Sequence, residues 1–146
     1  MIENERQYWI TRAWAEKFST SAQDIEGAQT DMDPVLRQAM KEQYVSQAEE
    51  LQAQLQAYDA LRHGQVTVLE LDSLAELPDA LIRARIAAGL TQKELATRLG
   101  VKAQQIQRYE TTRYANASFR RVQAVASALG VRIHERVILP TASYMS

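Results

Sequence analysis

The sequence lacks cysteine and has few residues that interrupt helices. Its 146 residues include 3 prolines, 5 glycines and no cysteine. Without cysteine, a disulfide framework and a zinc-finger site are excluded. The low content of proline and glycine favours a helix-rich chain. No apolar run approaches the ~18 residues that a membrane-spanning helix needs. The N-terminus is acidic where a secretory signal would be basic. We therefore expect a cytoplasmic protein that does not bind a membrane.

Side chains that support catalysis are also scarce. The two histidines, His63 and His134, stand apart from any paired ligand pattern. The sequence contains no glycine-rich phosphate-binding loop, and the carboxylates of residues 1–77 follow the solvated faces of expected helices. We therefore expect no enzyme, and assign no catalytic residue, no metal site and no cofactor.

The net charge of −1 conceals an uneven distribution. Residues 1–77 hold 6 Lys and Arg against 14 Asp and Glu, a local charge of −8. Residues 78–131 hold 9 against 3, a local charge of +6, and residues 132–146 carry +1. A compact basic block is typical of proteins that bind a polyanion. A dipolar surface without any partner has the same pattern.

Residues 1–64 are predicted to form an acidic helical hairpin. An amphipathic pattern covers residues 3–22, and Asp33-Pro34 begins a second helix that can run to about Arg62, before His63-Gly64 ends it. The second helix carries an apolar seam of heptad type. This seam is either the core of the hairpin or an interface with a dimer mate or another partner, and it consists of Tyr44, Ala48, Leu51, Leu55 and Tyr58.

Two short segments change the periodicity from helical to alternating. Residues 65–71 (QVTVLEL), within a linker that spans 65–77, alternate β-branched and polar residues, and so does VRIHERVIL at the start of the C-terminal segment 132–146. We predict a short β-strand in each. Because a lone strand leaves its backbone groups unpaired, the two strands pair either with each other or each with a twin in a second subunit.

Residues 78–131 contain two short helical patterns joined at one glycine. In LTQKELATRLGVKAQQIQRYE, Thr91 and Glu94 form a capping box and Gly100 takes a left-handed turn. The second helix buries only Ile106 and Tyr109, which leaves a face of Gln, Lys and Arg side chains. A helix-turn-helix unit with such a face suits the DNA major groove, where amides pair with adenine and guanidinium groups with guanine.

Leu77 to Gly130 resembles the Xre/Cro-type helix-turn-helix family of phage repressors and bacterial antitoxins. Ala96, Gly100 and Ile106 stand at the family's small, turn and buried positions. The resemblance implies a mostly α fold with a domain of four or five helices. It also implies a buried salt bridge between Arg85 and Glu110. Two positions depart from the pattern, since Lys102 replaces the usual Ser or Thr cap and Thr112 replaces a frequent glycine.

The resemblance also implies which residues meet DNA. Gln92 matches a glutamine that contacts a phosphate and braces the recognition helix. The positions that face bases are occupied by Ala103, Gln104, Gln107 and Arg108, and those near the phosphate backbone by Lys102, Gln105, Arg113 and Asn116.

These patterns together predict a sequence-specific repressor that binds a palindromic double-stranded operator as a homodimer. The resemblance favours an antitoxin that represses its own toxin–antitoxin operon and binds its toxin through the N-terminal region. One alternative is a phage-type repressor without a toxin partner, in which that region only dimerises. The other is an interaction module whose helix-turn-helix fold no longer binds DNA.

Overall fold

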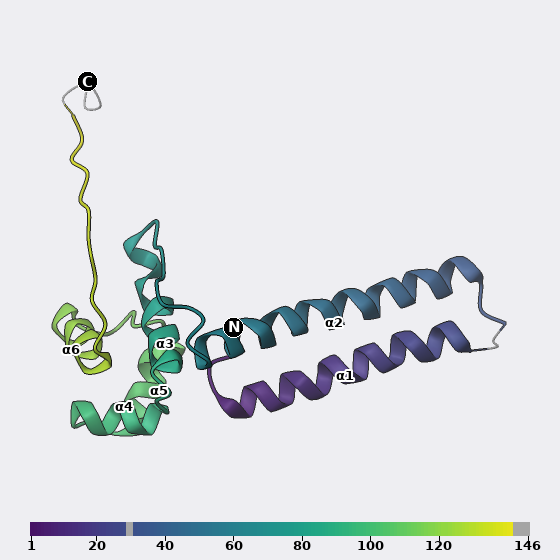
Figure 1. Cartoon of the computed structure of the whole chain (residues 1–146), viewed down its shortest axis with the longest axis horizontal. Helices are drawn as coiled ribbons and strands as arrows, with labels where there is room; N and C mark the ends of the chain where they lie inside the picture. The colour runs from purple at the N-terminus through teal and green to yellow at the C-terminus, as the bar shows by residue number, and fades with distance from the viewer. Residues whose placement is uncertain (29–30, 142–146) are drawn as a thin grey trace.

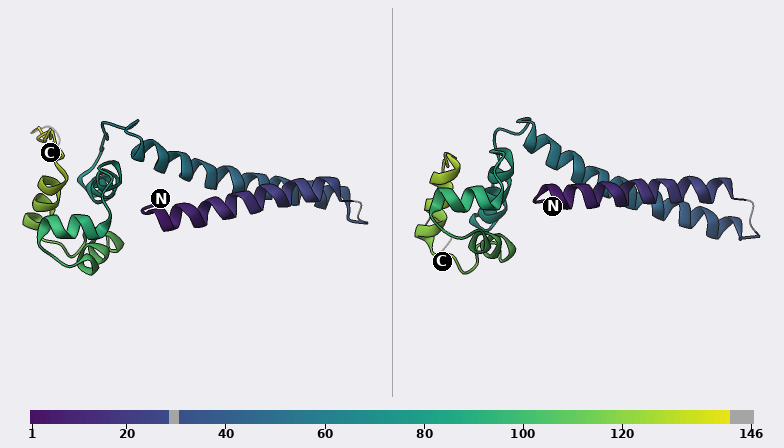
Figure 2. Two further views of the ribbon diagram at one scale, coloured as in Figure 1. Left: turned by 60° about the horizontal axis from the view of Figure 1, so that its bottom comes forward. Right: turned by 90° about the horizontal axis from the view of Figure 1, so that it is seen from below.

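The computed structural model describes residues 1–28 and 31–141, and these are mostly helical. The elements in chain order are α1 (Glu5–Gly27), α2 (Pro34–Arg62), the short 3-10 helix η1 (Leu74–Glu76), α3 (Leu77–Ala87), α4 (Gln92–Leu99), α5 (Ala103–Thr111) and α6 (Phe119–Leu129). The long helices α1 and α2 form a hairpin that projects from a bundle of the four shorter helices (Figures 1 and 2). The mostly helical fold expected from the sequence is therefore confirmed.

The hairpin helices begin and end at residues with suitable caps. The Asn4 side chain accepts a hydrogen bond from the Gln7 amide, and the Asp33 side chain accepts one from the Val35 amide. α2 ends at Arg62, with His63 as its C-cap, and the following Gly64 adopts a φ of +70° that glycine reaches without steric cost. The predicted limits of α2 are confirmed, whereas α1 extends five residues beyond its predicted end at residue 22.

The apolar seam of α2 lies inside the hairpin. The rings of Tyr8 and Tyr58 are 5.4 Å apart and those of Phe18 and Tyr44 are 6.4 Å apart, so α1 of the same chain covers the seam. Within the single chain the seam is thus part of the hairpin core, one of the two alternatives that its spacing left open. An additional interface with a second chain stays a prediction. The side chains concerned are buried or half-buried: Tyr44, Ala48, Leu51, Leu55 and Tyr58.

The base of the hairpin belongs to the same hydrophobic core as the helical bundle. Ile2, Tyr58 and Leu61 are buried in one cluster with Leu81 and Ile82 of α3. The cluster continues through α4, α5 and α6, where its buried members are Leu95, Ala96, Ile106, Val125 and Leu129. Because these side chains exclude water together, the hairpin is packed onto the bundle rather than tethered to it.

The two predicted β-strands are wrong for the single chain. Within residues 1–28 and 31–141 the structure contains no strand, and residues 65–71 and 131–139 run without regular secondary structure. The C-terminal segment leaves the bundle after α6 and extends away from it (Figure 1). No hydrogen bond joins the two segments among the described residues. An extended segment becomes a strand only when a second backbone pairs with it, and one chain does not supply that backbone here.

Candidate nucleic-acid interface

Helices α4 and α5 meet at a tight turn that the sequence encodes locally. The Thr91 side chain accepts a hydrogen bond from the Glu94 amide, and the Glu94 carboxylate accepts one from the Thr91 amide, which completes the capping box. Gly100 ends α4 in the left-handed conformation, with φ at +69°. The small side chain of Ala96, 2% exposed, lies in the core beside Ile106. These features fix the angle at which α5 leaves α4.

Helix α5 has one buried and one exposed face. Ile106 and Glu110 are buried, and Tyr109 is half-buried. The opposite face carries residues spaced one, three and one positions apart along the helix. These are exposed: Ala103, Gln104, Gln107 and Arg108. Within the described part of the chain, the side chains of Gln104, Gln107 and Arg108 make no hydrogen bond. Their donors and acceptors are therefore available to a ligand.

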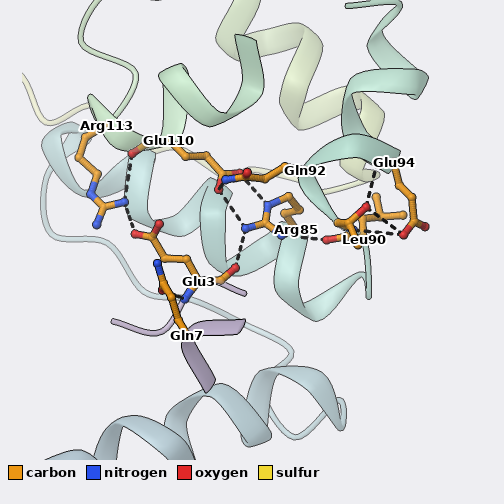
Figure 3. A network of polar contacts seen from close by, with 9 residues as sticks. Glu3, Gln7, Arg85, Leu90, Gln92, Glu94, Glu110 and Arg113 are labelled. Carbon is orange, nitrogen blue, oxygen red and sulfur yellow. Dashed lines mark hydrogen bonds and ion pairs between the residues drawn. The ribbon is translucent and has the colours of Figure 1, made fainter. Parts of the chain in front are cut away.

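A buried ion pair anchors α5 to α3. Arg85 of α3 donates from Nε to Glu110 Oε2 at 2.7 Å and from Nη2 to Oε1 at 2.9 Å, and the two side chains are 3% and 1% exposed. Arg85 Nη1 also donates to the Leu90 carbonyl at 2.9 Å (Figure 3). This two-bond arrangement is the strong form of a charge-assisted hydrogen bond, and it fixes the C-terminal half of α5.

Gln92 joins α4 to the same carboxylate. Its Nε2 donates to Glu110 Oε1 at 2.9 Å, and the side chain is half-buried. Glu110 thereby connects three helices at one point (Figure 3). Side chains held by such a network keep a recognition surface in one geometry before the ligand arrives.

Residues 81–136 match the model of the helix-turn-helix family. These residues belong to the Xre/Cro-type helix-turn-helix family. The match covers α4, α5 and α6 in full and most of α3, while the hairpin lies outside it. Searches of curated proteins and of solved structures found no match. The match supports a DNA-binding regulator.

The segment before α1 completes the network beneath the helix-turn-helix domain. The Glu3 carbonyl accepts a hydrogen bond from Arg85 Nη2 at 2.7 Å. The Glu3 carboxylate pairs with Arg113 Nη1 at 2.6 Å, and Asp79 pairs with Arg113 Nε at 3.2 Å. The Glu3 carboxylate accepts a hydrogen bond from Arg113, and this bond raises the pKa of the Arg113 guanidinium. Sequence reasoning missed Glu3 and Asp79, because no local pattern links residues so far apart in the chain.

The helix-turn-helix domain therefore places Arg113 differently from the other predicted DNA contacts. Arg113 lies in the loop after α5, where two carboxylates already bind its guanidinium. A phosphate contact by this side chain would compete with Glu3 and Asp79. The structure thus brings Arg113 to the junction with the hairpin rather than to the exposed face of α5, and its contact with phosphate stays a prediction.

The loop after α5 turns without the glycine that is frequent in this family. Arg113 and Tyr114 both adopt left-handed backbone conformations, with φ at 52° and 58°. The buried ring of Tyr114 stacks on Tyr109 with centroids 5.7 Å apart, and burial raises the pKa of its phenol. The Thr112 hydroxyl donates to the Arg108 carbonyl at 2.9 Å. Packing of the two rings thus holds a backbone conformation that is otherwise unfavourable for these residues.

The remaining predicted backbone contacts differ in how accessible they are. Lys102 precedes α5 as its cap, is exposed, and makes no side-chain capping hydrogen bond. Asn116 is exposed in the loop. Gln105 donates to the Tyr109 hydroxyl at 2.7 Å and is half-buried, so it would have to leave Tyr109 to bind a phosphate.

Other classes of site find little support in the described residues. No group of three or more His, Asp or Glu side chains comes together there in a metal-binding arrangement. His63 caps α2, with its Nδ1 2.8 Å from the Asp59 carbonyl oxygen, and His134 is exposed. In the same part of the chain, no helix combines the length and hydropathy of a membrane span.

Proposed function

We propose that the protein is a sequence-specific transcriptional repressor that reads the DNA major groove with the exposed face of α5. The observation that carries this proposal is the set of free side chains on that face, above a buried network that fixes the helix. Gln104 and Gln107 offer amides that bridge two groups on adenine, and Arg108 offers a guanidinium that bridges two on guanine.

The N-terminal end of α5 suits a phosphate. Because Lys102 makes no side-chain cap, its neighbouring backbone amides have no side-chain partner. A phosphate oxygen at this point would accept from those amides and pair with the Lys102 ammonium group. Gln92, at the start of α4, would serve a second phosphate with the part of its amide that Glu110 does not occupy.

A two-fold dimer on a palindromic operator follows from the size of one recognition helix. One helix-turn-helix unit reads only a few base pairs, and two units bind half-sites one helical turn apart. We propose that the protein dimerises for this reason.

The decisive experiment replaces Arg108. The operator is first selected from a random duplex library, and binding of each variant is then titrated. We expect Arg108→Ala to cost about 1–3 kcal/mol on the operator and to relax the preference at one base pair. Arg83→Ala is the matched control, because Arg83 is exposed on α3 and its loss removes the same charge. Operator binding by Arg108→Ala that equals the parent's would refute the assigned helix face.

We further propose that the protein is an antitoxin whose hairpin binds a toxin protein. The supporting observation is the outward side of α1, where Trp9 is 58% exposed and Ile10 and Trp14 are about half exposed. Trp9 and Trp14 also lie beneath the cationic groups of Arg12 and Lys17. Exposed tryptophans near basic groups are typical of protein interfaces.

The antitoxin proposal is tested by expressing the small reading frame beside this gene. We expect that frame alone to arrest growth and co-expression with this protein to restore it. Trp9→Ser should abolish the rescue while operator binding remains unchanged. If no neighbouring frame is toxic, the phage-type repressor without a partner is the better description.

A further inference from the structure

Two segments of the chain have backbone groups without a partner. Within the described residues, the backbone of 132–140 makes no hydrogen bond, and neither does that of 66–71. Large apolar side chains are exposed along both: Val68 is 70% exposed, and Val137, Ile138 and Leu139 are between 76% and 83% exposed. An exposed extended segment with alternating apolar residues is a template for pairing with another backbone.

The two segments have opposite charges. The C-terminal segment carries Arg132 and Arg136 against one carboxylate, Glu135. Residues 65–72 carry Glu70 and Asp72 and no cation. Cross-strand pairs of opposite charge stabilise a ladder, whereas like charges directly opposite one another destabilise it. The charges therefore favour pairing of one segment with the other over pairing of either with its own copy.

One antiparallel register sets Arg136 opposite Glu70 and also forms two apolar pairs. Residues directly opposite each other in an antiparallel ladder point to the same face. With Arg136 opposite Glu70, the first face carries two polar pairs and one apolar pair, which are Arg136–Glu70, His134–Asp72 and Ile138–Val68. The second face carries the apolar pair Val137–Leu69, flanked by the mixed pairs Glu135–Leu71 and Leu139–Thr67.

We propose that the C-terminal segment of one copy of this protein pairs in this register with residues 66–72 of a second copy. Reciprocal exchange gives two equivalent ladders about a two-fold axis and closes the dimer. Pairing of two C-terminal segments is less favourable, because a two-fold axis at the centre of the segment sets Glu135 against Glu135 or Arg136 against Arg136. The inference rests on the proposed dimer but not on DNA binding, and its tests contain no DNA.

Disulfide trapping tests the register directly, because the chain has no cysteine of its own. Val68→Cys and Ile138→Cys are made in separate full-length chains that differ in tag length, then mixed and oxidised mildly. Opposite residues in an antiparallel ladder have Cα atoms about 4.5–5.5 Å apart, within the range that a disulfide spans. We expect a covalent heterodimer in the mixture and little covalent dimer in either variant alone. Val35→Cys, on the exposed start of α2, replaces Val68→Cys in the control.

Three results would overturn the proposal. The first is a covalent homodimer of Glu135→Cys alone, which indicates pairing between C-terminal segments. The second is a monomer with an internal disulfide from the Val68→Cys/Ile138→Cys double variant, which indicates pairing within one chain. The third is the absence of any cross-link above the Val35→Cys control.

A charge exchange provides an independent measurement. Arg136→Glu sets like charges opposite Glu70 in both ladders, so we expect the dimer dissociation constant to rise roughly tenfold in sedimentation experiments. Glu70→Arg/Arg136→Glu restores the attraction and should return the constant to near the parent's value. If the double variant dimerises no better than Arg136→Glu, these residues are not opposite one another. Unchanged thermal melting of all variants shows that the helical bundle is intact.

Discussion

Replacement of Arg85 by alanine should destabilise the helix-turn-helix domain severely. The change leaves the Glu110 carboxylate buried without its cation, and breaking a buried ion pair on one side costs about 3–5 kcal/mol. The carbonyls of Leu90 and Glu3 also lose a donor, at about 1 kcal/mol each. We therefore expect a loss of roughly 5–7 kcal/mol. Total stabilities are about 5–15 kcal/mol, so this loss leaves the domain close to unfolding.

The assay is urea unfolding followed by circular dichroism, with thermal melting beside it. Arg83→Ala, two residues away and exposed, should stay within about 0.5 kcal/mol of the parent, whereas the melting temperature of Arg85→Ala should fall by more than about 10 °C. The double variant Arg85→Ala/Glu110→Gln should be more stable than Arg85→Ala, because the unpaired charge is gone. A loss below about 1 kcal/mol for Arg85→Ala, or a double variant less stable than the single one, would refute the reasoning.

Three further changes probe α5 and the loop that follows it. Lys102→Ala should weaken binding to all DNA sequences alike and reduce the slope of log affinity against log salt concentration by roughly one unit; a changed base preference with an unchanged slope would reverse that assignment. Arg113→Gly should be more stable than Arg113→Ala by about 1 kcal/mol in urea unfolding, because φ is 52°. Burial raises the pKa of Tyr114 above the ordinary value of about 10. The buried neutral phenol therefore stabilises the fold below about pH 10, and this stabilisation is lost as the pH rises further. Tyr114→Phe should therefore lose less stability than the parent when titrated from pH 9 to pH 11.

The helix-turn-helix domain was predictable because its signals are local. The capping box of Thr91 and Glu94 and the left-handed turn at Gly100 each depend on residues within four positions of one another. Alternation of buried and exposed residues along α5 likewise follows from the helical repeat. The same argument applies to Asp33 and Pro34, which begin α2 where the sequence indicates.

The junction between the hairpin and the domain was not predictable. Glu3 contacts Arg85 and Arg113 across 82 and 110 positions of the chain, and an acidic residue near the N-terminus has no property that specifies such partners. The seam of α2 is a second feature for which the sequence does not specify the partner. Its heptad spacing correctly indicates that another helix covers it, but spacing alone does not distinguish α1 from a helix of a second chain.

The extended segments show most directly what a period of two can and cannot specify. Alternation in residues 65–71 and 131–139 indicates β-strands. In a strand, the apolar face packs against other side chains and the backbone pairs with a neighbouring strand. The single chain leaves both requirements unmet, since Val68 and Val137 stay exposed and no ladder forms within the described residues. In the dimer that we propose, another molecule buries these side chains. The opposite charges at Glu70 and Arg136 support a second copy of the same chain as that partner.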